Sequence, residues 1–183
     1  MKQITHKGTV TLETERLLLR RFVADDAQEM FENYASDDEV TRYLTWQPYK
    51  SVDETRDWIL GLIDSYEGDE NYLWAIVLKD SDTLIGSIGI KITATHFRGE
   101  IGYVIGRKYW NKGFMTEALN AILEFGFKEL GITRIQACHH TENIASGKVM
   151  QKAGMQYEGC LKSWAITNTG ELADCEMYSR CLD

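Results

Sequence analysis

The stretch from Arg107 to Leu130 (RKYWNKGFMTEALNAILEFGFKEL) joins a short basic turn to an apolar-periodic helix. One glycine, Gly113, stands at the junction, and Lys108 and Lys112 precede it. A glycine lets the backbone approach a ligand closely, and the first N–H groups of a helix are unpaired and carry a partial positive charge. Together these features predict an anion site, most naturally for a phosphate or pyrophosphate group.

The sequence lacks the motifs of several common phosphate-binding and hydrolytic enzymes. No GxxxxGK[ST] loop, GxGxxG turn, G-x-S-x-G elbow or HExxH helix is present. The four cysteines form no CxxC pair and no zinc spacing with the four histidines. These absences argue against a kinase, a Rossmann enzyme, a serine hydrolase and a zinc peptidase.

Composition is that of a globular, non-membrane protein. The 183 residues suit one domain, 44% of them are hydrophobic, and no apolar run approaches the roughly 20 residues of a membrane span. The N-terminus lacks the apolar core of a signal peptide, so we expect a cytoplasmic protein with reduced thiols. A net charge of −8 argues against a nucleic-acid partner and makes the basic turn at 107–112 a local exception.

The first third of the chain predicts one strand and two helices after a loose arm at residues 1–14. Glu15–Phe22 (ERLLLRRF) alternates like a strand. Asp25–Ala35 begins with acidic residues, as helices do. Ser51 opens a capping-box pattern (S-V-D-E) into a helix that we expect to end near Gly68.

The remainder alternates strand and helix patterns around several turns. A turn at Ser81–Asp82 joins an antiparallel strand pair, and Asn143 and Gly154 are the expected N-cap and left-handed stop of a later helix. Further strands are predicted at 98–106, 133–139, 157–167 and 172–180. The order β-αα-βββ-α-β-α-ββ describes a mixed α/β (α+β) sandwich around one sheet, in a single domain spanning 1–183.

Several ordered blocks of the chain resemble the GNAT superfamily of acetyl-CoA-dependent N-acetyltransferases, specifically its RimJ/RimL-like branch. The blocks are TERLLLRRF (14–22), GEIGYVIGRKYWNKGFMTEAL (99–119), ENIASGKVMQKAGMQYEG (142–159) and the closing D-x-x-x-Y of Asp174 and Tyr178. The resemblance covers roughly residue 12 to the C-terminus. It implies a single N-acetyltransferase domain with a central, twisted, mostly antiparallel sheet of about seven strands flanked by helices.

The cofactor implied by this resemblance is acetyl-CoA. The family's motif, (Gln/Arg)-x-x-Gly-x-(Gly/Ala), falls on residues 110–115, where Gly113 is kept, Trp110 takes the first position and Met115 replaces the final small residue. Because backbone amides bind the pyrophosphate, Met115 is compatible with binding if its side chain points into the core. The implied cofactor-binding residues are Tyr103, Val104, Ile105, Lys108, Trp110, Asn111, Lys112, Gly113, Phe114, Met115, Thr116, Asn143 and Ser146.

The resemblance also implies which residues carry the chemistry. Glu100 lies on the strand where many family members place their general base. The tyrosine that protonates the departing thiolate in many relatives is replaced here by Met150, and Ser146 is the substitute we expect. Each has a simpler alternative: Glu100 as a solvated strand residue, and Ser146 as a structural residue of a first helical turn. The predicted reaction is direct transfer, with no metal and no covalent acyl-enzyme.

The acceptor is predicted to be a primary amine. Relatives build the acceptor cleft from the region that here contains Tyr43, Trp46 and Tyr49, and Glu100 faces the same substrate; Trp58 is more simply a core residue. The amine belongs either to a protein N-terminus, as in ribosomal-protein acetyltransferases, or to a small molecule. A catalytically silent acyl-CoA-binding or regulatory module and a pure interaction protein are the alternatives. The chain is expected to act as a monomer or homodimer.

Overall fold

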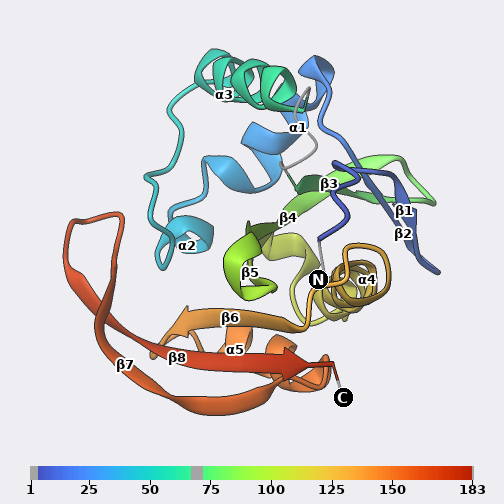
Figure 1. The fold of residues 1–183 in the computed structure, drawn as a ribbon. Coiled ribbons are helices and arrows are strands. Elements are labelled where there is room, and N and C mark those ends of the chain that lie inside the picture. The colour runs from blue at the N-terminus through green and yellow to red at the C-terminus, as the bar shows by residue number, and fades with distance from the viewer. Residues whose placement is uncertain (1–3, 67–71, 183) are drawn as a thin grey trace.

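One sheet of eight strands forms the centre of the molecule (Figure 1). The computed structural model describes residues 4–66 and 72–182. The strands lie in the order β1-β2-β3-β4-β5-β6-β8-β7, and neighbours are antiparallel except β5 and β6, which run parallel. Their bounds are β1 (Leu12–Glu13), β2 (Leu17–Arg20), β3 (Leu73–Leu78), β4 (Thr83–Thr93), β5 (Arg98–Ile105), β6 (Arg134–His140), β7 (Gln156–Ile166) and β8 (Leu172–Cys181).

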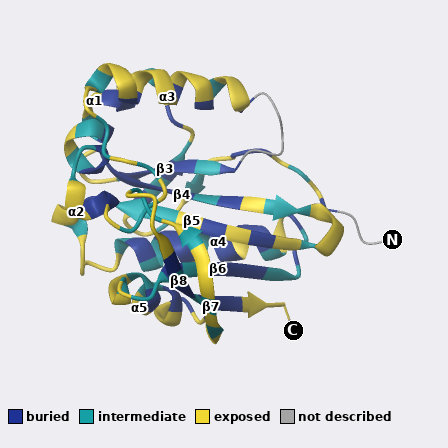
Figure 2. Ribbon diagram, turned by 90° about the vertical axis from the view of Figure 1, so that its left-hand side faces the viewer, coloured by how far each residue is buried: buried dark blue, intermediate teal, exposed yellow. Residues whose placement is uncertain are grey.

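Helices cover both faces of this sheet, as predicted. On one face α1 and α3 lie together, and Figure 2 shows the outer side of α3 largely exposed. On the other face α4 and α5 pack against each other and against the sheet. The helices are α1 (Ala27–Met30), α2 (Asp38–Thr41), α3 (Val52–Ser65), α4 (Phe114–Lys128) and α5 (Ile144–Lys152), with 3-10 turns at Ala24–Asp26, Ala94–His96 and Arg107–Tyr109 and a π-helical turn at Phe31–Ala35. The predicted element order is confirmed, with two short elements added: β1 in front and α2 between the two predicted helices.

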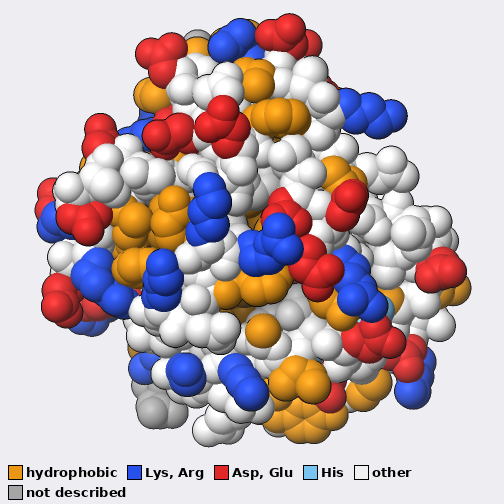
Figure 3. Space-filling model, turned by 180° about the vertical axis from the view of Figure 1, so that it is seen from behind, with side chains coloured by type: hydrophobic (Ala, Val, Ile, Leu, Met, Phe, Trp, Pro, Cys, Tyr) orange, Lys and Arg blue, Asp and Glu red, His pale blue; other side chains and the backbone are white. Residues whose placement is uncertain are grey.

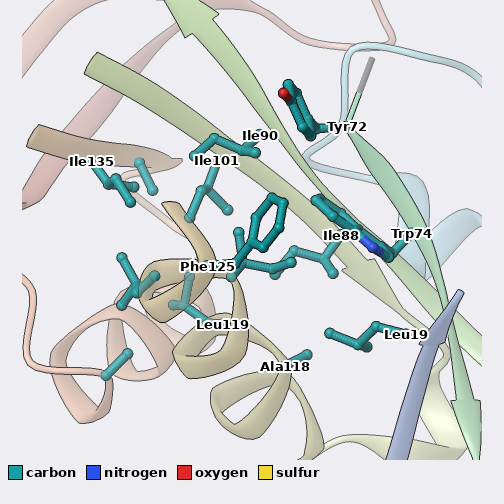
Figure 4. Close-up of a cluster of buried hydrophobic side chains, with 14 of the residues drawn as sticks. Leu19, Tyr72, Trp74, Ile88, Ile90, Ile101, Ala118, Leu119, Phe125 and Ile135 are labelled. Carbon is teal, nitrogen blue, oxygen red and sulfur yellow. The ribbon is translucent and has the colours of Figure 1, made fainter. Parts of the chain in front are cut away.

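Alternating strand side chains build two hydrophobic cores. Leu17 and Leu19 of β2 are fully buried in the core that includes α4, whereas Phe22 belongs to the core under α1 and α3. Figure 4 shows Phe125 of α4 reaching toward the sheet, where its ring lies nearly perpendicular to that of Trp74, with 5.6 Å between the ring centres. Burying each such side chain contributes about 1.5–3 kcal/mol to the stability of the fold. Residues of α4 and of β5 share one core, so this burial holds the two elements in a fixed relative position.

The segment 4–14, which we expected to be a loose arm, is packed along the sheet. The Trp74 indole N–H donates to the carbonyl of Val10 at 2.6 Å, and the Leu73 N–H donates to the Thr9 hydroxyl at 3.2 Å. This expectation was wrong because the segment supplies acceptors to donors at the start of β3 and adds the strand β1. Such partners are what a buried indole or backbone N–H requires.

The two helices predicted in the first third exist with different ends. The segment 25–35 is a composite of 3-10, α and π-helical turns rather than one regular helix. The Ser51 side chain caps α3 by accepting the Glu54 N–H at 3.1 Å, as predicted. Helix α3 ends at Ser65, and Gly68 lies outside the described residues.

The surface mixes charges of both signs. On the face seen in Figure 3, lysine, arginine, aspartate and glutamate side chains are interspersed rather than segregated. All four cysteines are free thiols. Within residues 4–66 and 72–182, no helix is both long enough and apolar enough to cross a membrane.

Candidate active site

The parallel strands β5 and β6 separate after a short paired stretch. They pair over three positions, the last joining Glu100 to Gln136. Beyond it, Ile101–Ile105 keeps β4 as a partner on one side, while the described strands offer none on the other. The resulting gap, which we call the splay cleft, has a volume of about 770 Å³ and reaches the N-terminal ends of α4 and α5. Because an unpaired strand edge presents free N–H and C=O groups, this cleft suits a ligand that pairs with the backbone.

The predicted anion site lies at one end of the splay cleft. Gly113 precedes α4 with φ of +82°, in the left-handed region that favours glycine. The Glu117 N–H donates to the Gly113 carbonyl at 3.0 Å, so the N–H groups of residues 114–116 come before the first bond of the helix. Gly113 and these three residues line the cleft. The arrangement places free donors and the positive end of a 15-residue helix where a phosphate would bind.

Arg16, which directly precedes β2, braces this turn. Its guanidinium donates to the Lys112 carbonyl at 3.0 Å, pairs with the Glu117 carboxylate at 2.7 Å and lies 4.5 Å from the centre of the Phe114 ring. Partial burial opposes ionisation of Glu117, but hydrogen bonds from Thr14 and Arg16 outweigh it and hold the pKa of this carboxyl below its usual range. Glu117 therefore stays charged at neutral pH and keeps Arg16 on the turn.

All but two of the residues predicted to hold the cofactor line the splay cleft. Those lining it are Tyr103, Val104, Ile105, Trp110, Asn111, Gly113, Phe114, Met115, Thr116, Asn143 and Ser146. Lys108 and Lys112 are exposed and are not part of its wall, and the Lys112 ammonium lies over the Tyr109 ring at 5.6 Å. Met115 is only 5% exposed and packs into the core beside α4, the placement that its bulk requires.

A hydroxyl pair lies where α5 begins. Asn143 caps this helix by accepting the Ser146 N–H at 3.3 Å, as its N-cap prediction requires. The Tyr103 hydroxyl of β5 lies 2.9 Å from Ser146 Oγ and donates to the Ser146 carbonyl at 3.0 Å. Burial raises the pKa of Tyr103 well above its usual range, although its hydrogen bond to Ser146 opposes the rise. Tyr103 therefore keeps its proton near neutral pH and acts as a hydrogen-bond donor.

Glu100 stands where the splay cleft meets a second cavity. Its carboxylate is exposed and accepts a hydrogen bond from Gln136 Nε2 at 3.0 Å. Gln136 is only 8% exposed, so its amide is held in place by the surrounding sheet. Glu100 lines both cavities, as do Gly102, Tyr103 and Val104.

The second cavity lies on the α1 and α3 side of the sheet and also measures about 770 Å³. We call it the aromatic pocket because its wall contains Tyr34, Trp46, Tyr49, Trp58 and Tyr72. The rings of Trp46 and Tyr49 lie 5.5 Å apart, centre to centre. The structure thus places two of the three aromatic residues predicted for the acceptor in one pocket.

The other aromatic predictions need correction. Tyr43 lines the splay cleft instead of the aromatic pocket, with its ring 5.0 Å from that of His140. Trp58, which we interpreted as a core residue, is 38% exposed and lines the aromatic pocket. Tyr43 is placed by the course of the segment 41–47, which is held by hydrogen bonds to Asn168 at the tip of the β7–β8 hairpin (Figure 1).

Sequence reasoning missed four residues that shape the site: Arg16, Gln136, Tyr34 and Ser87. Two of them left a signal in the sequence. Gln136 is the lone amide in the strand RIQACHH, and Ser87 is the lone hydroxyl in the apolar run LIGSIGI. A polar side chain in a buried strand needs a partner or a ligand. Arg16 and Tyr34 left none, because their roles depend on segments distant in the sequence.

Comparisons with known proteins agree with this architecture. The sequence profile of the acetyltransferase (GNAT) domain matches residues 16–156. An uncharacterised N-acetyltransferase of Bacillus licheniformis is 39% identical over 171 residues, covering 92% of this chain and 94% of that protein. The crystal structure of a GNAT-family acetyltransferase from Bacillus anthracis is 31% identical, with a TM-score of 0.81 over 94% of this chain and 98% of that one. RimL, a ribosomal-protein acetyltransferase solved with coenzyme A, is 22% identical, with a TM-score of 0.83 over 95% and 99% of the two chains.

Proposed function

The chain belongs to the GNAT acetyltransferase family, and we propose that it moves the acetyl group of acetyl-CoA directly to the nitrogen of a primary amine. One observation carries the proposal. The splay cleft, with its helix N-terminus, and the aromatic pocket share Glu100, Gly102, Tyr103 and Val104 as wall residues. An acyl donor in the first cavity and an amine in the second would meet at these residues, and such alignment of two reactants is a major source of rate enhancement.

The residues of the splay cleft fit coenzyme A. Gly113 and the free N–H groups of residues 114–116 suit its pyrophosphate, and the unpaired edge of Ile101–Ile105 suits the amides of its pantetheine arm. The solved RimL complex contains coenzyme A in the same fold, which supports this assignment by analogy. Two residues of this chain differ from the family's cofactor motif, and both fit the structure. Met115 packs into the core, and the Trp110 indole N–H donates to the Ile105 carbonyl at 2.8 Å.

We assign the two proton transfers of the proposed reaction to Glu100 and Ser146. Acetyl-CoA supplies the acetyl group as a thioester; in the transfer an N–C bond forms, the C–S bond breaks, the nitrogen loses one proton and the sulfur gains one. Glu100, oriented by Gln136, accepts the proton of the amine directly or through one water. The Ser146 hydroxyl donates to the departing sulfur, and the neighbouring Tyr103 hydroxyl, 2.9 Å from Ser146 Oγ, holds it in place.

The protonation state of Cys138, the cysteine in the wall of the splay cleft, supports direct transfer rather than an acyl-cysteine intermediate. Cys138 lines the splay cleft, but burial raises its pKa to about 12. A cysteine is a nucleophile only as its thiolate, which is then scarce at neutral pH. The amine is therefore the nucleophile in the proposed reaction.

The test of the proposed function is a thiol-release assay. The purified protein is incubated with acetyl-CoA and a panel of small primary amines, polyamines and peptides with free N-termini, and free coenzyme A is measured. We expect amine-dependent release together with N-acetylated product in mass spectrometry. Binding of coenzyme A without turnover of any amine would instead identify a silent acyl-CoA-binding module.

The roles of Tyr103 and Ser146 predict coupled effects on turnover. We expect Tyr103→Phe and Ser146→Ala each to lower kcat about 10-fold, the value of one hydrogen bond, with the KM for acetyl-CoA little changed. Because the two hydroxyls act as one donor, the double variant should be no slower than either single variant. Steady-state kinetics of the four proteins measures this coupling.

Tyr157→Phe is the matched control, since Tyr157 lies on the exposed face of β7 and outside both cavities. It should keep the kcat of the parent protein. Losses that multiply in the double variant would mean that the two hydroxyls act separately. An unchanged kcat in Ser146→Ala would assign the proton donor to water.

A further inference from the structure

The aromatic pocket is charged at one end only. Lys91 and Glu100 face each other across the β4–β5 register and stand beside the splay cleft. Apart from these and His6, the described residues that line the pocket are uncharged. A polyamine acceptor would call for carboxylates at both ends of its chain, so this lining favours an acceptor with one amine and an uncharged body.

The floor of the aromatic pocket is open at Gly102, and the hydroxyl group of Ser87 lies beyond it. Gly102 pairs with Gly89, and Val104 pairs with Ser87, so these residues share the face on which Glu100 lies. At about 3.4 Å per residue, Ser87 stands about 7 Å from Gly102 and about 14 Å from Glu100 along the strand. The space over Gly102 is open, since a Cβ added there would meet no atom within 4 Å, whereas the Leu73 side chain covers Gly89. An acceptor whose amine lies at Glu100 can therefore lie flat on the sheet with its far end at Ser87.

The inner wall ends the pocket at Ser87. Ser87 is 8% exposed, and Tyr34 behind it is fully buried. The Tyr34 hydroxyl has no hydrogen bond of normal geometry within the part of the chain that the structure describes. The neighbouring Ser87 hydroxyl opposes the strong rise that burial causes in the pKa of Tyr34. Tyr34 thus remains a neutral phenol near Ser87. A buried phenol without a hydrogen-bond partner favours a ligand that adds a polar group beside Ser87 and Tyr34.

We propose that the acceptor is a compact arylalkylamine with a hydroxyl group at the end of the ring farthest from its amine, and that Ser87 binds this hydroxyl. This inference rests on the proposed acetyl transfer. The ring packs against Trp46, Tyr49 and Trp58, whose flat faces suit another aromatic ring. The volume of about 770 Å³ lies within the range of about 300–1,000 Å³ common for small-molecule sites.

The test compares two amines that differ by one hydroxyl. Initial rates with tyramine and with phenethylamine are measured for the parent protein, for Ser87→Ala and for the control Ser81→Ala, which alters an exposed serine in the β3–β4 turn. We expect the parent protein and the control to prefer tyramine about 10-fold in kcat/KM, the value of one hydrogen bond. In Ser87→Ala this preference should fall to about 1, with phenethylamine turnover retained as evidence of an intact fold.

Other outcomes separate this inference from the proposed function. A preference that survives in Ser87→Ala, or that is absent from the parent protein, would overturn the role of Ser87. Turnover of peptides with free N-termini or of spermidine, with none of either arylalkylamine, would overturn the acceptor class while leaving acetyl transfer in place. Failure of every amine and peptide would overturn both.

Discussion

Replacing Gly102 with valine is expected to lower kcat/KM by at least about 10²-fold without lowering the thermal midpoint. Gly102 lies at the junction of the two cavities, and a Cβ added there meets no atom within 4 Å. The new side chain therefore projects into the space that the reactants share. A misplacement of about 1 Å is enough to cost about 10²-fold in rate. Its backbone does not have a positive φ, and a β-branched residue suits a strand better than glycine does, so the fold should tolerate the change.

The measurement combines kinetics with thermal unfolding, and two further variants calibrate it. Gly102→Ala should give an intermediate loss of activity, because its single methyl group fills less of the junction. Gly61→Ala is the matched control: Gly61 also has open space around it but lies on α3, away from both cavities. The control should keep full activity. A Gly102→Val protein that keeps both its fold and its activity would show that the two cavities do not share the reacting atoms.

Local signals in the sequence account for most of the fold. The alternation of Leu17 and Leu19, the caps at Ser51 and Asn143 and the left-handed stop at Gly154 depend on a few neighbouring residues, and the structure confirms each. These features are governed by side-chain period and by backbone hydrogen bonds close in sequence. The same holds for the glycine turn before α4.

The site depends more on contacts between distant segments. Tyr103 meets Ser146 across 43 residues, and Arg16 reaches Glu117 across 101 residues. A sequence pattern can place Tyr103 on a strand, but its hydroxyl finds Ser146 only because α5 packs beside the separated strands. The glycine turn could be predicted because it depends on neighbouring residues. Its brace by Arg16 could not, because Arg16 lies 96 residues before Lys112 in the sequence.

The acceptor side shows this limit most clearly. The aromatic residues of the segment 41–47 divide between the two cavities, since Thr41 and Gln47 are tied to Asn168 in the β7–β8 hairpin. Sequence spacing cannot predict this tie across more than 120 residues. It therefore could not separate Tyr43, in the splay cleft, from Trp46, in the aromatic pocket.

Glu100→Gln is expected to lower kcat/KM about 10²–10⁴-fold at neutral pH, the usual contribution of a general base. Glutamine keeps the size of the side chain and its contact with Gln136 but cannot accept the amine's proton. An alkylamine has a pKa near ~10, so the free base becomes abundant as the pH rises. The deficit of the variant should therefore shrink between pH 7 and pH 10, because the substrate then arrives already deprotonated. A pH–rate profile of the parent and variant proteins measures this change.

Glu171→Gln serves as the matched control, since Glu171 is exposed in the turn of the β7–β8 hairpin and lines neither cavity. It should reproduce the parent profile at every pH. A Glu100→Gln deficit that stays constant up to pH 10 would mean that Glu100 positions the amine rather than deprotonating it. An unchanged profile would remove Glu100 from the reaction and leave water as the base. The pH dependence thus separates three roles that the position of Glu100 at the meeting point of the two cavities permits.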